Sequence, residues 1–196
     1  MRYAEINRST SETEIKLSFS ADGVGDAEID SGAGFLDHML TLFAHHGRFD
    51  ITLRCRGDVE TDLHHTVEDT GICLGDAFAK ALGDRRGITR YADITLPMDE
   101  ALVTAAVDIS GRGVLVYDLG TLAEKVGVFD TETAREFWSA FCRRSGATLH
   151  LRRITGENTH HILEASFKAA ARALRRAIEI DEQFADEVPS SKGLLE

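Results

Sequence analysis

The hydrophobic and polar positions along this chain follow one series of patterns twice. Residues 47–57 and 146–156 are glycine-bounded segments of equal length in which apolar and polar residues alternate. Such alternation is typical of a strand with one buried face. Each segment follows an amphipathic stretch, residues 35–46 in the first half and residues 133–144 in the second. The chain therefore contains an internal repeat, and a repeat constrains the architecture strongly.

Each predicted strand leads into a longer helical segment, residues 64–82 and residues 160–174. Apolar residues recur there every three or four positions, as expected for a helix packed on a sheet. Further strands are predicted at residues 2–8, 13–20 and 24–30, and at residues 87–95, 101–109 and 113–119. Each half therefore has the order strands, helix, strand, helix. This order predicts an α+β fold of two βαβ-type units, each a mixed sheet with two helices on one face, packed face to face.

The predicted boundaries are residues 1–86 for the first repeat and residues 87–180 for the second. Residues 181–196 lose the periodicity and are predicted to form an irregular C-terminal tail. The chain has two prolines and short connections, so the repeats are expected to form one compact body rather than tethered domains.

Charge and cysteine content restrict the classes of partner. The formal net charge is −11, which argues against nucleic acid or an anionic membrane as a partner, since both require a basic surface. No apolar run reaches the roughly 18 residues that span a bilayer. The three cysteines are widely spaced, which favours a reduced protein over a disulfide scaffold. A cytoplasmic location is expected.

Four of the eight histidines fall in two identical pentads with the pattern His-His-x-x-Glu, at residues 64–68 and 160–164. On a helix, His65 and Glu68 are three residues apart and share a face, as do His161 and Glu164. Each of these pairs is predicted to chelate one cation. The first histidine of each pentad is turned by about 100° on the helix and is free to serve a different cation.

The repeat also suggests how two metals divide the ligands. Aligning the shorter amphipathic segments places His38 opposite Glu136. One metal is then predicted to bind four residues, namely His38, His65, Glu68 and His160. The other is predicted to bind Glu136, His161, Glu164 and His64. Imidazole and carboxylate ligands without thiolate suit Mn²⁺ or Fe²⁺ better than a structural zinc.

A structural interpretation competes with this one. A single pentad is explained equally well as a polar helix start, but two copies at matching repeat positions favour a site. For His45, His46 and His150 a structural role is at least as well supported. The first two close a predicted helix, where cations are favourable, and the third lies in a strand pattern.

Eight short motifs follow one another along the chain, namely Arg8 to Thr13, Gly34 to Leu40, Asp62 to Asp69, Gly87 to Tyr91, Pro97 to Ala101, Asp108 to Arg112, Gly156 to Glu164 and Pro189 to Gly193. In the order and spacing of these motifs, the chain resembles the imidazoleglycerol-phosphate dehydratases over essentially its whole length. The fold that this resemblance implies is a duplicated βαβ-type unit of the ribosomal S5 domain 2-like kind, which agrees with the repeat.

The resemblance implies a Mn²⁺-dependent hydro-lyase of histidine biosynthesis that converts D-erythro-imidazole glycerol phosphate to imidazole acetol phosphate. It implies two Mn²⁺ ions per active site, bound by the pentads, His38 and position 136. It also implies substrate contacts from Glu12, Arg90, Arg112, Ser190, Ser191 and Lys192, the last three in the tail. Glu12 is the candidate acid/base, and Glu164 or Glu68 are ligands that could double in that role. Family members assemble as shells of 24 subunits with active sites shared between neighbours.

Position 136 departs from the family pattern, because many relatives have a histidine where this chain has Glu136. A carboxylate still binds Mn²⁺, so the site is expected to survive with one more negative charge. Two other functions remain open from the residues alone. One is a binuclear hydrolase of phosphate esters, and the other is an assembly protein in which metal joins subunits without turnover.

Overall fold

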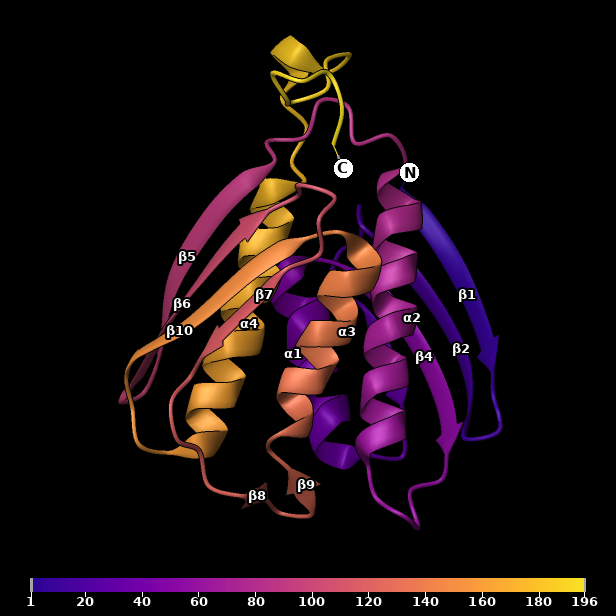
Figure 1. Cartoon of the computed structure of the whole chain (residues 1–196), viewed down its shortest axis with the longest axis vertical. Coiled ribbons are helices and arrows are strands. Elements are labelled where there is room, and N and C mark those ends of the chain that lie inside the picture. The colour runs from indigo at the N-terminus through magenta and orange to yellow at the C-terminus, as the bar shows by residue number, and fades with distance from the viewer. Residues whose placement is uncertain (1, 196) are drawn as a thin grey trace.

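The computed structural model describes residues 2–195 and has four helices between two four-stranded sheets (Figure 1). The first sheet has the order β1-β2-β4-β3. Its strands are β1 (Tyr3–Ser9), β2 (Thr13–Ser20), β3 (Ala27–Asp30) and β4 (Asp50–Gly57). The strand β3 runs parallel to β4, and the other neighbours are antiparallel.

The second sheet repeats this arrangement, with the order β5-β6-β10-β7. Its strands are β5 (Tyr91–Met98), β6 (Ala101–Asp108), β7 (Leu115–Asp118) and β10 (Thr148–Thr155). Here too the last strand, β7, runs parallel to its neighbour β10. Both sheets are therefore mixed and equivalent strand by strand, which confirms the predicted α+β fold with two repeated units.

The helices are α1 (Gly34–Gly47), α2 (His64–Leu82), α3 (Thr133–Ser145) and α4 (Thr159–Ala177). The helix α2 covers β1 and β2, and α4 covers β5 and β6. The shorter helices cross over, because α1 packs on α4 and α3 packs on α2 (Figure 1). Each half therefore places its shorter helix beside the longer helix of the other half.

Two glycines allow α2 and α3 to approach closely. A Cβ atom on Gly71 would lie 2.5 Å from the carbonyl oxygen of Phe137, and one on Gly75 would lie 2.7 Å from that of Phe141. Both distances are far below a normal contact, so a side chain at either position would push the helices apart. Elsewhere among the four helices the space is filled by buried aromatic rings. One of them is Trp138 on α3, whose ring centroid lies 4.7 Å from that of Phe167 on α4.

Most predicted elements are present, with differences at their ends. The strand β5 begins at Tyr91 rather than at residue 87, because the backbone amides of Thr89 and Arg90 bond to carbonyl oxygens at the end of α4. The strand β3 begins later than predicted because the Asp50 carboxylate accepts the amides of residues 24–26, which are then not paired with a neighbouring strand. A two-residue hairpin, β8 (Lys125–Val126) with β9 (Phe129–Asp130), is too short to show in the sequence pattern.

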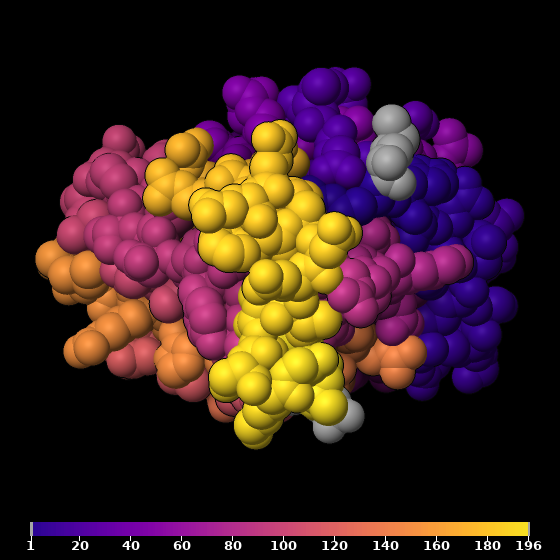
Figure 2. Space-filling view, turned by 90° about the horizontal axis from the view of Figure 1, so that it is seen from above, coloured from indigo at the N-terminus to yellow at the C-terminus, as the bar shows by residue number. Residues whose placement is uncertain are grey.

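The tail is largely irregular, as predicted, with one 3-10 turn at Glu182–Phe184. It lies across one end of the molecule, over the segment that precedes β5 (Figure 2). Backbone bonds join it there, from Gly87 to Glu187 at 2.9 Å and from Asp181 to Gly87 at 2.8 Å. Within residues 2–195, no helix is long and apolar enough to cross a membrane.

Candidate metal centre and substrate site

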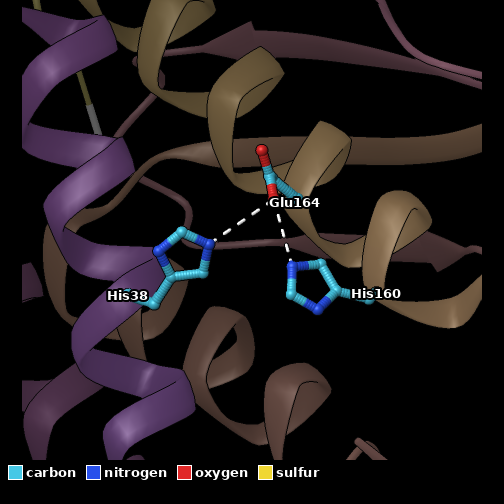
Figure 3. Close-up of side chains that lie close together, drawn as sticks. All are labelled: His38, His160 and Glu164. Atoms are coloured by element: carbon cyan, nitrogen blue, oxygen red, sulfur yellow. Dashed lines mark hydrogen bonds and ion pairs between the residues drawn. The ribbon is translucent and has the colours of Figure 1, made fainter.

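Three potential ligands from the two halves meet between α1 and α4 (Figure 3). Nε2 of His38 lies 3.5 Å from Oε2 of Glu164, and Nε2 of His160 lies 3.2 Å from the same oxygen. Among residues 2–195 this is the one group of three or more side chains whose ligand atoms all lie within 4.8 Å of one another. The cross-over of the shorter helices brings His38 to this place.

These separations fit a common cation. Two ligand atoms at right angles on an octahedral ion with bonds of about 2.1 Å lie roughly 3 Å apart. Two imidazole nitrogens and one carboxylate oxygen are a donor set that suits Mn²⁺ or Fe²⁺. Both rings are partly exposed and Glu164 is buried, so solvent and substrate can reach the open side of the group.

The local sequence orients these donors. The Asn158 side chain caps α4 by accepting the amides of His160 and His161, which fixes where the helix begins. Lys168, one helical turn after Glu164, donates a hydrogen bond to Oε1 of Glu164 and leaves Oε2 to face the two histidines. Burial opposes ionisation of Glu164, but Lys168 and the two histidines outweigh it and lower the pKa of this carboxyl. Glu164 is therefore favoured in its ionised form, the form that binds a cation.

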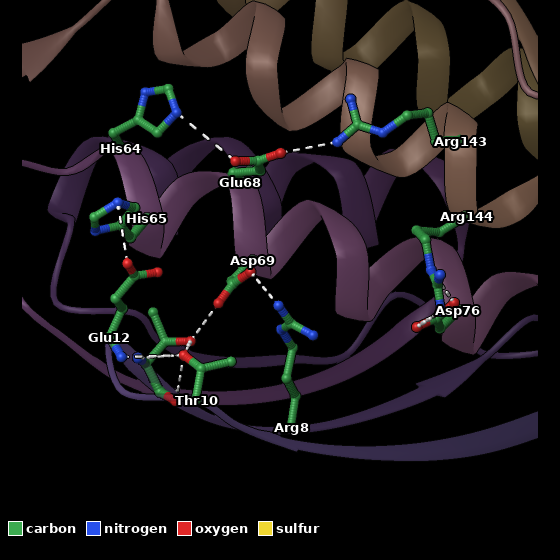
Figure 4. A network of polar contacts seen from close by, with 11 residues as sticks. Arg8, Thr10, Glu12, His64, His65, Glu68, Asp69, Asp76, Arg143 and Arg144 are labelled. Atoms are coloured by element: carbon green, nitrogen blue, oxygen red, sulfur yellow. Dashed lines mark hydrogen bonds and ion pairs between the residues drawn. The ribbon is translucent and has the colours of Figure 1, made fainter.

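The corresponding positions in the other half form a looser group. Nε2 of His64 lies 3.7 Å from Oε2 of Glu68, while Oε1 of Glu68 accepts a 2.8 Å hydrogen bond from Arg143 on α3 (Figure 4). Glu136 lies in the first turn of α3, as the repeat alignment requires, and is half-buried. The chain thus has the same arrangement twice, a carboxylate with one oxygen held by a cation and the other facing a histidine.

The side chains group differently within this chain from the predicted division of ligands. The glutamate of each pentad faces the first histidine, four residues before it, and not the second histidine, three residues before it. His38 lies with His160, as predicted for the same metal, but the carboxylate beside them is Glu164 and not Glu68. His38 comes from the first half and lies beside two residues of the second half.

The second histidines are held by carboxylates that the sequence did not single out. Nδ1 of His65 lies 2.9 Å from Oδ2 of Asp58, and Nδ1 of His161 lies 2.7 Å from Oε2 of Glu100. These bonds raise the pKa of both histidines. The His161 bond, with the amide of Asn158, lowers the pKa of Glu100 to about 2. Glu100 lies within the motif Pro97 to Ala101, and this was the one feature of the sequence that could have pointed to it.

A buried network places Glu12 near His65 (Figure 4). Asp69 on α2 accepts hydrogen bonds from Arg8 at 2.9 Å and from the hydroxyl of Thr13, which flank the β1–β2 turn. In that turn the Thr10 hydroxyl accepts the amide of Glu12. Oε1 of Glu12 then lies 3.7 Å from Nε2 of His65. The Arg8 to Thr13 motif thus holds a carboxylate at the start of α2.

We expect Asp69→Asn to lower the free energy of unfolding of the metal-free protein by about 1.5–3 kcal/mol, the usual value of a hydrogen bond to a charged group. Urea unfolding measures this change. Asp76→Asn is the matched control, because Asp76 lies on the same helix and pairs with Arg144 at 2.7 Å but is more exposed. Its loss should stay below about 1 kcal/mol. If both variants lost the same free energy of unfolding, the buried network around Asp69 would contribute no more to stability than the exposed ion pair of Asp76.

The implied substrate contacts other than Glu12 lie toward the opposite end of the molecule. Arg90 donates to Asp108 at 2.8 Å and to the carbonyl oxygen of Pro189 at 2.8 Å, which draws the tail toward the second sheet. Arg112 lies 3.4 Å from the same aspartate and is more than half exposed. Ser190, Ser191 and Lys192 follow Pro189 directly, and the Ser190 hydroxyl accepts the amide of Lys192. Arg90 thus links the tail to a cationic cluster.

The remaining histidines lie where the structural interpretation placed them. His45 and His46 are in the last turn of α1, and His150 is an exposed residue of β10.

Comparison with known proteins identifies the family of the chain. Residues 31–174 match the family model described as imidazoleglycerol-phosphate dehydratase. Curated proteins of that name from Methylorubrum populi and Caldanaerobacter subterraneus subsp. tengcongensis are 56% and 53% identical over 195 residues, covering 100% of both chains in each case.

Two solved structures resemble the whole chain. The imidazoleglycerol-phosphate dehydratase of Staphylococcus aureus superposes with a TM-score of 0.82 at 38% identity, covering 91% of this chain and 99% of that one. The Pyrococcus furiosus enzyme, in complex with (S)-C348, gives a TM-score of 0.84 at 36% identity, covering 97% and 100%. The chain is therefore a member of the imidazoleglycerol-phosphate dehydratase family, hydro-lyases that act on a small molecule and whose name places them in histidine biosynthesis.

Proposed function

We propose that this protein dehydrates D-erythro-imidazole glycerol phosphate to imidazole acetol phosphate with two Mn²⁺ ions per active site. The observation that carries the proposal is the group of His38, His160 and Glu164, whose ligand atoms lie at separations suited to one octahedral ion. Glu136, His64 and Glu68 are proposed as the equivalent group, with His65 and His161 as the remaining ligands. The bound metals would act as Lewis acids that fix the imidazole ring and the departing hydroxyl.

The reaction removes a hydroxyl and the proton of a neighbouring carbon, which together leave as water. That C–H bond is not next to a carbonyl group, so the imidazole ring must serve in its place. The ring first donates electrons that expel the hydroxyl from the carbon attached to it, and it then accepts the electrons of the neighbouring C–H bond as the proton is removed. The resulting enol tautomerises to the ketone. A positioned carboxylate has to move the protons, which typically contributes about 10²–10⁴-fold to the rate.

Glu12 is the proposed proton carrier. Its carboxylate lies beside Nε2 of His65 and is half-exposed, so it can approach a bound substrate. Glu68 and Glu164 are less suited to this role, because one oxygen of each is bound by Arg143 or Lys168 and the other faces a histidine.

Arg90, Arg112, Ser190, Ser191 and Lys192 are the proposed phosphate ligands. Arginine can bind phosphate through two parallel hydrogen bonds, and a lysine adds a mobile cation. Asp108 bonds to both arginines and so sets the spacing of their guanidinium groups. Since the chain as a whole carries a net charge of −11, this local cluster supplies what an anionic substrate needs.

One chain cannot bring these two parts together. The amide of Arg90 bonds to the carbonyl oxygen of Ala177 at the end of α4, whereas His160 lies at its beginning. A helix rises 1.5 Å per residue, so the two positions are about 25 Å apart. The proposed active site therefore combines the metal ligands of one subunit with the phosphate ligands of another. This supports self-association, proposed as a shell of 24 subunits, and we propose a cytoplasmic location.

One assay tests the proposal against its rivals. The Mn²⁺-loaded protein is incubated with imidazole glycerol phosphate, and formation of an enolisable ketone is followed by absorbance in alkali. A phosphate-ester hydrolase would release inorganic phosphate instead, and a metal-dependent assembly protein would give neither product. Absence of the ketone with intact, metal-loaded protein would refute the dehydratase assignment.

Mn²⁺ should raise the melting temperature more at pH 8 than at pH 6. Because the pKa values of His65 and His161 are raised, both rings favour the protonated form to above pH 6.5 in the metal-free protein. Their protonation stabilises that form below pH 6.5, and this contribution is lost as the pH rises through the raised pKa. Metal requires the neutral rings, so its binding strengthens over the same interval and releases protons. Thermal unfolding with and without Mn²⁺ measures the difference, and an equal gain at both pH values would contradict it.

A further inference from the structure

The second histidine of each pentad is held by a carboxylate from outside its own helix. Nδ1 of His65 contacts Asp58, which follows β4, and Nδ1 of His161 contacts Glu100, in the turn between β5 and β6. The turn between β5 and β6 corresponds to the turn between β1 and β2 in the first half, whereas Asp58 follows β4, so the two carboxylates are not repeat equivalents. The two halves reach the same bond from different places, and common descent of the repeats does not explain it.

The opposite edge of each ring is open. The nearest carboxylates to the two Nε2 atoms are Glu12 beside His65 and Asp99 beside His161, both at 3.7 Å, which is too long for a hydrogen bond. Both side chains remain partly exposed. Neither second histidine has a ligand partner on its own helix, since the pentad glutamates face the first histidines.

The two carboxylates are themselves fixed. Oε1 of Glu100 accepts the amides of Glu157 at 3.3 Å and Asn158 at 2.9 Å, which leaves Oε2 for His161. Oδ1 of Asp58 is buried without a hydrogen-bond partner. Burying an unpaired carboxylate oxygen is unfavourable, so Asp58 does not owe its place to stability alone.

A neutral imidazole carries one proton. When Nδ1–H donates to a carboxylate, the lone pair is on Nε2 and the plane of the ring is fixed, which is how metal-binding histidines are commonly oriented. We propose that Asp58 and Glu100 are positioning residues of the metal sites, which hold His65 and His161 through Nδ1 and present Nε2 to a metal. This inference rests on the proposed Mn²⁺-dependent function.

Glu100→Gln tests the proposal with little change in shape. The Gln oxygen can keep both backbone bonds, while its amide nitrogen would donate to Nδ1 of His161. The proton of the ring then moves to Nε2, which can no longer bind a metal. We expect Mn²⁺ affinity to fall about 10–100-fold at one of the two sites, the usual effect of losing such a contact. Titration calorimetry measures the affinity, and long-range ¹H–¹⁵N spectra of metal-free, ¹⁵N-histidine-labelled protein report the tautomer.

Asp99→Asn is the matched control, because it removes the same charge near the same histidine without touching Nδ1. Its Mn²⁺ affinity should stay within about threefold of the original. Asp58→Ala should weaken the metal that His65 binds, and because one oxygen of Asp58 is unpaired, the fold should tolerate it.

The outcomes separate the inference from the function on which it rests. Unchanged Mn²⁺ binding in Glu100→Gln and Asp58→Ala would overturn the inference, as would an equal loss in Asp99→Asn. A wild-type protein that binds no Mn²⁺ would overturn the proposed function instead.

Discussion

A mixture of two inactive variants is expected to regain activity. His160→Ala removes a proposed metal ligand, and the double variant Arg112→Ala, Lys192→Ala removes two proposed phosphate ligands at the other end of the molecule. Each loss of a charge-assisted bond costs about 1.5–3 kcal/mol, so the double variant alone should lose roughly 10²–10⁴-fold in activity. In a 1:1 co-assembly, about a quarter of the sites should combine the intact part of each chain, if two subunits form each site.

The experiment mixes the two metal-free proteins, adds Mn²⁺ and measures turnover. Differently tagged chains recovered together establish that mixed assemblies have formed. Homogeneous assemblies of each variant, prepared in the same way, are the control. If co-assembled chains show just the sum of the separate activities, each site belongs to a single chain.

His160→Ala alone should nearly abolish both Mn²⁺ binding at one site and turnover. The variant removes one of three ligand atoms around a common position, while α4 keeps its Asn158 cap and its buried face. Loss of an outer-shell contact already weakens metal binding by about 10–100-fold, so loss of a direct ligand should cost at least about 100-fold. Electron paramagnetic resonance of free Mn²⁺ measures the stoichiometry.

His150→Ala is the control for this variant, since His150 is an exposed histidine on β10. It should keep both metals and full activity. A His160→Ala protein that retained two tightly bound Mn²⁺ ions per chain would exclude the group with His38 and Glu164 as a metal centre.

The sequence was sufficient to predict the architecture because the repeat constrains it twice. Alternation and helical periodicity located the eight strands of the two sheets and the four helices, and the second copy of each element supported the first. The ends were less predictable. Where β5 begins is decided by bonds from Thr89 and Arg90 to the end of α4, which is far away in the sequence.

The site residues could be nominated from the sequence, but their grouping could not. Residues three and four positions apart are both neighbours on a helix, so the pentad allows Glu164 to face either His160 or His161. In the structure Glu100 holds His161, and Glu164 faces His160. That choice depends on a turn that precedes the helix by many residues, and no spacing within the pentad encodes it.

The cross-over of the shorter helices bears on which amino-acid substitutions a duplicated chain can accumulate. A single half, made alone, would leave two helix faces uncovered, and pairing with an identical copy would cover them. In such a pair, positions 38 and 136 would be one and the same residue. Joining the halves in one polypeptide removes that identity, so a substitution can alter one of the two proposed metal centres and spare the other. The histidine at position 38 and the glutamate at position 136 are a difference that a symmetric pair of half-length chains could never carry.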